Sequence, residues 1–186
     1  MCELCDESLS DHGRARRRLV FAGASAGALL LAPMSAFAAR PRALSFYHTH
    51  TGERLRVTYA EGSRHIPEAL DEISKFLRDF RSGESHPMDP GLFDILHQLQ
   101  QSTGASGPFE IISAYRSPQT NEMLRNNGNG VAQGSLHMEG RAIDVRLRGV
   151  QTRKLRQAAL NLQAGGVGYY ERSDFIHVDT GRVRFW

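Results

Sequence analysis

The 186-residue chain lacks features that define several protein classes. Its two cysteines, Cys2 and Cys5, lie near the N-terminus, so residues 39–186 contain no cysteine and need a hydrophobic core rather than disulfide bonds for stability. One C-x-x-C pair without a second is a weak sign of metal or redox chemistry. The formal net charge is only +3, which does not favour a nucleic-acid partner. The chain also has no internal repeat and no long low-complexity tract.

The longest apolar stretch lies at the N-terminus and has the pattern of an export signal. A basic cluster at residues 14–18 precedes an apolar run and the small-residue ending Ala36-Phe37-Ala38. Paired arginines before a mildly hydrophobic run resemble the twin-arginine signal, which exports folded proteins; the general secretory signal is the alternative. The run makes a poor permanent membrane anchor, because it contains several Gly and Ala residues and Pro33. The alternative to a cleaved signal is an N-terminal membrane helix that stays uncleaved. We predict a signal peptide at 1–38, a periplasmic location and a mature domain at 39–186.

The mature region predicts a single α+β domain, with helices packed on a small, largely antiparallel sheet. Alternating residues indicate strands, and apolar residues at helical spacing indicate helices. Asp89 followed by Pro90, and Ser117 followed by Pro118, each predict a helix start. The expected elements are a hairpin at 44–59, helices at 65–83, 89–104, 117–125 and 152–163, strands at 109–115, 141–147 and 174–180, a loop at 126–135, and a loop or short strand at 165–170.

Two of these strands carry polar residues that could bind a metal. Alternation places Asp144 on the face opposite the apolar residues of its strand, and it places His177 likewise on the last strand. If the two strands are neighbours, these side chains converge, and His137 can reach them from a turn eased by Gly140. Two imidazoles and a carboxylate form the ligand set of a catalytic zinc ion, which keeps an open position for water and lowers its pKa.

Each of these residues also has an ordinary structural interpretation. Taken alone, His137 suits a loop, Asp144 a salt bridge at a strand end and His177 a half-buried strand position. Spacing alone leaves the metal site and the structural alternative open. A second possible metal pair, His48 and His50, shares one strand face, but solvated hairpin residues are the simpler interpretation.

A longer motif distinguishes these interpretations. Residues 135–144, SLHMEGRAID, match all five fixed positions of S-x-H-x-x-G-x-A-x-D and so resemble the M15 family of zinc peptidases. Residues 113–117, SAYRS, are similar to that family's S-G-Y-R segment, with Ala114 in place of Gly. Over nearly the whole mature region, the chain resembles the branch that contains murein endopeptidase K. The resemblance implies one Zn²⁺ ion held by His137, Asp144 and His177, and hydrolysis of peptide cross-links in peptidoglycan.

The resemblance also suggests roles for neighbouring residues. Arg116 would meet a substrate carboxylate or the polarised carbonyl oxygen; otherwise it is a structural arginine at a helix start. Ser135 would orient His137 or touch substrate, unless it is an ordinary turn serine. Tyr115 is either a wall of the cleft or a core residue.

The general base is where the sequence departs from the family pattern. Many members carry Glu three residues before the second His, whereas this chain has Asp174, which is one methylene shorter. Asp179 is the rival, because it shares a strand face with His177 and could either orient this ligand or take the proton itself.

These observations predict a zinc-dependent murein endopeptidase acting on stem peptides that include D-centres or diaminopimelate. One alternative is a D,D- or L,D-carboxypeptidase that trims a stem terminus. The other, motivated by the missing Glu, is a metal-containing module that binds the cell wall without cleaving it. We expect no nucleic-acid partner and no stable membrane insertion after signal cleavage; the sequence does not specify an oligomeric state.

Overall fold

The computed structural model describes residues 41–127 and 132–186. The predicted signal peptide at 1–38 lies outside these residues, as does part of the loop predicted at 126–135. Within the described ranges, no helix combines the length and apolar character needed to cross a membrane.

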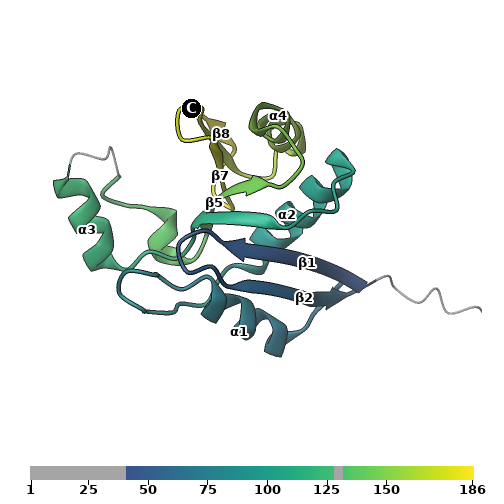
Figure 1. Cartoon of the computed structure of the whole chain (residues 1–186), viewed down its shortest axis with the longest axis horizontal. Helices are drawn as coiled ribbons and strands as arrows, with labels where there is room; N and C mark the ends of the chain where they lie inside the picture. The colour runs from purple at the N-terminus through teal and green to yellow at the C-terminus, as the bar shows by residue number, and fades with distance from the viewer. Residues whose placement is uncertain (1–40, 128–131) are drawn as a thin grey trace, which may run out of the picture. The chain divides into compact units, whose positions relative to one another are not determined.

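The described residues form one mixed, mostly antiparallel sheet (Figure 1). Its strand order is β3-β2-β1-β4-β5-β7-β6-β8, and only the β1–β4 and β6–β8 pairs are parallel. The predicted α+β class is therefore confirmed. The strands are β1 Pro41–His48, β2 Arg54–Glu61, β3 Arg64–His65, β4 Phe109–Ser113, β5 Ala142–Leu147, β6 Gly166–Tyr170, β7 Phe175–Asp179 and β8 Arg184–Phe185.

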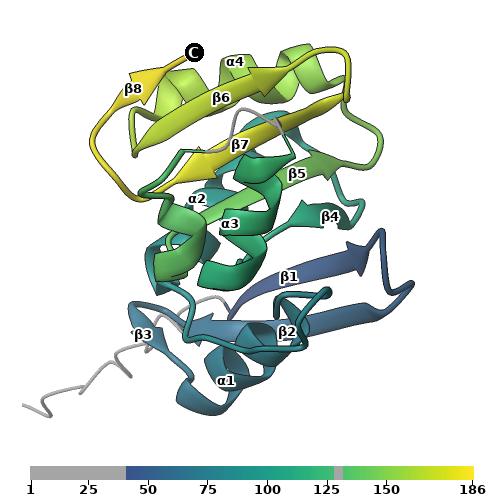
Figure 2. The same cartoon turned by 90° about the vertical axis from the view of Figure 1, so that its left-hand side faces the viewer.

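The helices lie on both faces of this sheet. They are α1 Pro67–Phe76, α2 Pro90–Thr103, α3 Pro118–Asn126, the 3₁₀ helix η1 Leu136–Glu139 and α4 Thr152–Leu162. Helices α2 and α4 contact each other and pack on the central strands, while α1 packs on β2. Figure 2 shows α3 in front of the sheet, with α2 and α4 behind it.

Local sequence signals account for the ends of most helices. The Asp89 carboxylate accepts a hydrogen bond of 2.9 Å from the Gly91 amide at the start of α2, and Ser117 accepts one of 3.2 Å from the Thr120 amide in α3. Both predicted helix starts are confirmed. Gly104 ends α2 with φ 67°, a left-handed conformation that glycine adopts easily.

Helix α1 is shorter than the sequence predicts. It ends at Phe76, whereas the expected end was Gly83. The intervening segment turns around buried Asp79, whose carboxylate accepts hydrogen bonds from the Arg81 amide (3.0 Å) and the distant Ser117 amide (2.9 Å). A continued helix would move this carboxylate away from Ser117, so the tertiary contact overrides the apolar periodicity.

The sheet separates an apolar core face from a polar face, as alternation predicts. Ile143, Val145 and Leu147 of β5, with Ile176 and Val178 of β7, are at most 1% exposed and belong to the core. β5 pairs directly with β7, and Asp144 lies opposite His177 in the register. The strand β8 was not predicted, because two residues are too few for a periodic pattern.

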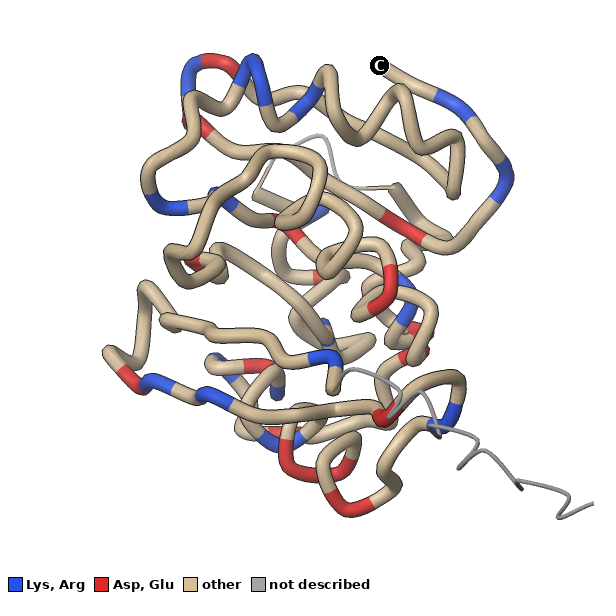
Figure 3. The backbone as a smooth tube through the Cα atoms, turned by 90° about the vertical axis from the view of Figure 1, so that its right-hand side faces the viewer, with Lys and Arg blue, Asp and Glu red and all other residues tan. Residues whose placement is uncertain are grey.

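Positive and negative residues are interspersed along the described chain (Figure 3). Several arginines pair with acids, including Arg148 with Glu110 at 2.8 Å and Arg153 with Glu171 at 3.0 Å. These exposed pairs contribute little stability individually.

Replacing Gly140 with Ala should destabilise the fold more than the same change at Gly104. Both glycines end helices with nearly equal φ, 66° and 67°, so the backbone strain is matched. A Cβ at residue 140 would lie 2.2 Å from the Pro87 carbonyl oxygen, whereas nothing lies within 4 Å at residue 104. We expect Gly140→Ala to cost about 1–3 kcal/mol beyond the control, measured by urea unfolding without added metal. Equal costs for the two variants would contradict the steric explanation.

Asp79→Asn should destabilise the fold in a pH-dependent manner. Burial acts to raise the pKa of Asp79, but hydrogen bonds from Thr120 and from the Ser117 and Arg81 amides outweigh it and lower the pKa below its ordinary 3.8. The charged form therefore stabilises the fold above pH 3.8, and this contribution is lost as pH falls through the lower folded pKa. We expect a loss of about 1–3 kcal/mol at pH 7 that shrinks in acid, measured by urea unfolding across pH. A pH-independent difference would contradict this account.

Candidate metal centre

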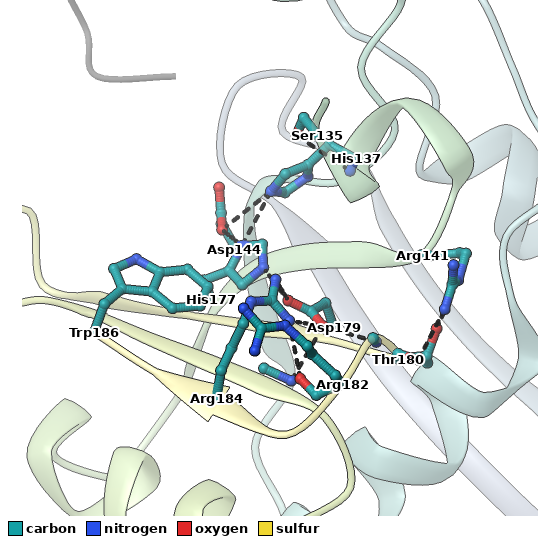
Figure 4. Close-up of polar contacts among 12 residues, drawn as sticks. Ser135, His137, Arg141, Asp144, His177, Asp179, Thr180, Arg182, Arg184 and Trp186 are labelled. Carbon is teal, nitrogen blue, oxygen red and sulfur yellow. Dashed lines mark hydrogen bonds and ion pairs between the residues drawn. The ribbon is translucent and has the colours of Figure 1, made fainter. Parts of the chain in front are cut away.

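Three buried side chains meet on the polar face of the sheet. His137, Asp144 and His177 form the one group in residues 41–127 and 132–186 with three possible ligand atoms within 4.8 Å of one another. Their exposed fractions are 3%, 7% and 6%. Asp144 and His177 come from the paired strands β5 and β7, and His137 comes from η1 (Figure 4).

The atoms that face one another are defined by short distances. His137 Nε2 lies 3.2 Å from His177 Nδ1 and 3.4 Å from Asp144 Oδ1. His177 Nδ1 lies 2.9 Å from the same carboxylate oxygen. The two imidazoles thus present different nitrogens to the common point, Nε2 from His137 and Nδ1 from His177.

The outward-facing nitrogens determine which protons the rings carry. His137 Nδ1 lies 2.6 Å from the Ala114 carbonyl oxygen, which only accepts hydrogen bonds, so this nitrogen carries a proton. His177 Nε2 lies 3.0 Å from Asp179 Oδ2 and donates to that carboxylate in the same way. In the neutral rings, both inward nitrogens therefore present lone pairs, next to a carboxylate oxygen.

This donor set fits a divalent metal ion. Three lone-pair atoms close together repel one another unless a cation lies among them, and two imidazoles with one carboxylate suit zinc. Hydrogen bonds from the outer nitrogens of ligand histidines to a carbonyl or carboxylate are the usual arrangement around such metals.

The pKa shifts of the ligand residues also favour positive charge at the cluster. Burial acts to raise the pKa of Asp144, but the nearby His137 and His177 rings lower it well below the usual range. Burial acts to lower the pKa of His177, yet hydrogen bonds to Asp144 and Asp179 raise it above 6.5. Both shifts favour positive charge at this point, as expected of a site for a cation.

Asp179 supports His177 from the side opposite Asp144 (Figure 4). It is fully buried and accepts hydrogen bonds from the Gly166 and Gly181 amides and from both terminal nitrogens of Arg184, at 2.7–3.1 Å. Burial acts to raise the pKa of Asp179, but the bonds with His177 and Arg184 lower it. Asp179 is therefore a charged residue that positions the His177 ring.

A cavity of about 330 Å³ opens onto the three ligands. One side carries aromatic rings, with Tyr170 stacked on Phe175 at a centroid distance of 4.6 Å. A larger groove of about 700 Å³ near α4 has no His, Asp or Glu in its lining. The cavity at the cluster is lined by Arg116, Ala132, Gly134, Ser135, Leu136, His137, Asp144, Tyr170, Phe175, His177, Arg184 and Trp186.

Arg116 lies in this cavity with much of its hydrogen-bonding capacity unused. Its contacts with Asn121 and Ser113 are long, at 3.4 Å each, and Asp144 Oδ2 is 4.0 Å away. Its buried Nε has no hydrogen-bond partner within the described part of the chain. Burial lowers the pKa of Arg116, while Asp144 acts to raise it. An incoming anion would therefore meet a guanidinium with free donors.

The other predicted site residues lie in different surroundings. Ser135 lines the cavity, and its hydroxyl accepts a 3.4 Å hydrogen bond from the His137 amide at the start of η1. Tyr115 belongs to the core, stacks on His86 and does not line the cavity. Asp174 also lies outside the cavity lining; its carboxylate bonds to Thr152 of α4 and lies 3.8 Å from Arg146.

The H-x-H pair does not form a metal site with a third ligand in the described residues. His48 is 1% exposed, and its Nδ1 accepts 3.3 Å hydrogen bonds from the His50 and Thr51 amides, which closes the hairpin turn. His50 stacks on Phe80 at 4.0 Å. The prediction that both are solvated was wrong for His48, because it caps the turn from inside.

Three residues of the site were missed in the sequence: Tyr170, Arg184 and Trp186. Arg184 and Trp186 lie around β8, which has no periodic pattern of its own. The sequence feature that could have indicated these neighbours lies in β6, where Gly166 and Gly168 share one face of the strand. A Cβ at residue 166 would lie 2.4 Å from Arg184, and one at residue 168 would lie 2.7 Å from the Trp186 ring.

Comparison with known proteins agrees with this geometry. The M15 peptidase family model described as peptidoglycan L,D-endopeptidase MepK matches residues 36–186. The peptidoglycan L,D-endopeptidase MepK of Escherichia coli K12 is 43% identical over 175 residues, which cover 92% of this chain and 96% of that protein. A probable peptidoglycan L,D-endopeptidase MepK of Haemophilus influenzae is 43% identical over 148 residues, covering 79% and 80%.

The resemblance based on the SLHMEGRAID motif is thus confirmed over residues 36–186. The residues that carry the motif are those that the fold brings together at the cluster. The chain belongs to the M15 peptidase family, in the branch described as peptidoglycan L,D-endopeptidase MepK.

Proposed function

We propose that this protein is a zinc-dependent endopeptidase that hydrolyses peptide cross-links in peptidoglycan. The observation that carries the proposal is the convergence of His137 Nε2, His177 Nδ1 and Asp144 Oδ1 on one point of a cavity. The family, and relatives whose names specify peptidoglycan L,D-endopeptidases, support the substrate and the reaction. Cross-links that involve D-centres or diaminopimelate are the proposed targets.

His137, Asp144 and His177 would hold one Zn²⁺ ion. When bound, zinc supplies Lewis-acid chemistry, which activates water and polarises a peptide carbonyl group at neutral pH. The protein's own contribution is to fix the ligands, because Ala114 and Asp179 hold the two rings in one tautomer and one orientation.

Arg116 is the proposed partner of negative charge on the substrate. It would bind a substrate carboxylate or the carbonyl oxygen as charge develops on it, and its unused donors suit either role. Ser135 is a proposed secondary contact at the same cavity wall, in addition to its bond with the His137 amide. Tyr115 is left out of the proposed site because it packs in the core.

The two candidate carboxylates are assigned different roles. Asp179 is fully buried behind His177 and has all its oxygens occupied, so we propose that it acts through His177 rather than on the substrate. Asp174 bonds to Thr152 and contacts Arg146 outside the cavity, which favours a structural role in the turn before β7. Proton transfer then falls to water or to another group of the cavity.

Export to the periplasm is part of the proposal. The signal-peptide pattern of residues 1–38 and the paired arginines support a twin-arginine route, and peptidoglycan in the names of the relatives supports the destination. Because the twin-arginine route exports folded proteins, it would suit an enzyme that folds around its metal in the cytoplasm.

Cross-link cleavage should depend on metal. Purified mature protein incubated with cross-linked muropeptides should release uncross-linked products, detected by mass spectrometry. A chelator should stop the reaction, and Zn²⁺ should restore it. Removal of only terminal residues would instead identify a carboxypeptidase, and binding without cleavage by zinc-loaded protein would identify a wall-binding module.

Asp179→Asn should weaken metal binding, while Asp174→Asn should not. The asparagine at 179 loses the charge that holds the His177 ring, so we expect metal affinity to fall about 10–100-fold in competition with a chelator. Asp174→Asn is the matched control, with unchanged affinity and turnover expected. Retained zinc but abolished turnover in Asp174→Asn would instead identify Asp174 as the base.

A further inference from the structure

The chain's one tryptophan, Trp186, lies against the metal cluster. Its ring centroid is 5.2 Å from that of His177, and the two side chains lie next to each other in Figure 4. Its indole Nε1 donates a 3.1 Å hydrogen bond to the Tyr170 hydroxyl oxygen. Both side chains line the cavity while remaining 48% and 40% exposed, so a ligand that enters can reach them.

The fold holds this pair in place from several sides. The Trp186 amide donates to the Val167 carbonyl at 3.2 Å, and its own carbonyl accepts from the Tyr169 amide at 3.0 Å. The indole occupies space that a side chain at Gly168 would fill, and the Arg184 guanidinium lies 5.1 Å from the ring centroid. The pair is therefore built into β6 and the segment after β8 rather than left as a free surface contact.

The direction of the hydrogen bond determines what Tyr170 can offer. An indole N–H only donates, so the phenol oxygen acts as acceptor in this contact. The hydroxyl proton of Tyr170 is then left to donate elsewhere, and the described residues give it no acceptor. A ligand group that meets Tyr170 must therefore be a hydrogen-bond acceptor, such as a carbonyl or carboxylate oxygen.

We propose that Tyr170, oriented by Trp186, donates a hydrogen bond to an acceptor oxygen of the peptide bound in the cavity. Arg116 and Arg184 line the same cavity, so its wall combines two guanidinium groups with the phenol donor. This set suits peptides rich in carboxylates and carbonyl oxygens, such as peptidoglycan stem peptides. The inference rests on the proposed function for the identity of this peptide.

Fluorescence of Trp186 provides a direct test of binding at this wall. Zinc-loaded protein is titrated with uncross-linked muropeptides, which carry the stem peptide but no cross-link to cleave. Because Trp186 is the chain's one tryptophan, a saturable change in emission would report a peptide beside it. Binding detected by calorimetry without any change in emission would overturn the proposal.

Kinetics of two single-atom changes test the hydroxyl itself. Tyr170→Phe should lower kcat/KM for cross-link cleavage about tenfold, while zinc content stays unchanged. Tyr169→Phe is the matched control, since Tyr169 packs against the core rather than lining the cavity. Equal activity of the two variants would contradict the proposal.

The role of Trp186 is tested by combining variants. Trp186→Phe keeps a ring but removes the N–H donor, so it should lower kcat/KM less than Tyr170→Phe does. In a Tyr170→Phe background it should have little further effect, because the hydroxyl that it orients is absent. Fully additive effects would overturn the proposed pairing.

These results separate this inference from the proposed function. If zinc-loaded protein binds muropeptides with a Trp186 signal that weakens in Tyr170→Phe but cleaves no cross-link, the endopeptidase proposal fails and the Tyr170 contact stands. If the Tyr170→Phe and Tyr169→Phe variants cleave cross-links equally well, the endopeptidase proposal stands and the Tyr170 contact fails.

Discussion

The site depends on the pairing of β5 with β7 in one register. This pairing places Asp144 directly opposite His177, with both side chains on the face away from the core. A shift of either strand by one residue would turn its ligand into the apolar core and bring a neighbour such as Ile143 or Val178 to the polar face in its place. The buried apolar residues that flank each ligand therefore fix the site, because their burial makes any other register costly.

A second set of contacts makes the ligands specific. The Ala114 carbonyl and the Asp179 carboxylate each hold one imidazole, so the rings present Nε2 in one case and Nδ1 in the other. Arg184 and two backbone amides hold Asp179 in turn. The C-terminal segment thus belongs to the site, through Arg184 behind His177 and Trp186 beside it. In the proposed enzyme, substrate specificity and ligand geometry would share these residues.

Sequence reasoning succeeded where the physical signal is local. Alternation in 141–147 and 174–180 predicted the faces of Asp144 and His177, and the helix starts predicted at Asp89 and Ser117 were confirmed. It failed where contacts between residues far apart in the sequence determine the local structure. The bond of Asp79 to the Ser117 amide ends α1 early, and His48 caps a turn from inside the fold. Arg184 and Trp186 could not be placed, because a two-residue strand has no periodicity, although the glycines of β6 indicate a close neighbour.

Anomalous diffraction at the zinc absorption edge from crystals of the zinc-loaded protein would test the central claim most directly. We predict one strong anomalous peak, in contact with His137 Nε2, His177 Nδ1 and an Asp144 oxygen. The mixed use of Nε2 and Nδ1 follows from the hydrogen bonds to Ala114 and Asp179. A peak at another position, or coordination through His177 Nε2 with loss of its bond to Asp179, would contradict the account.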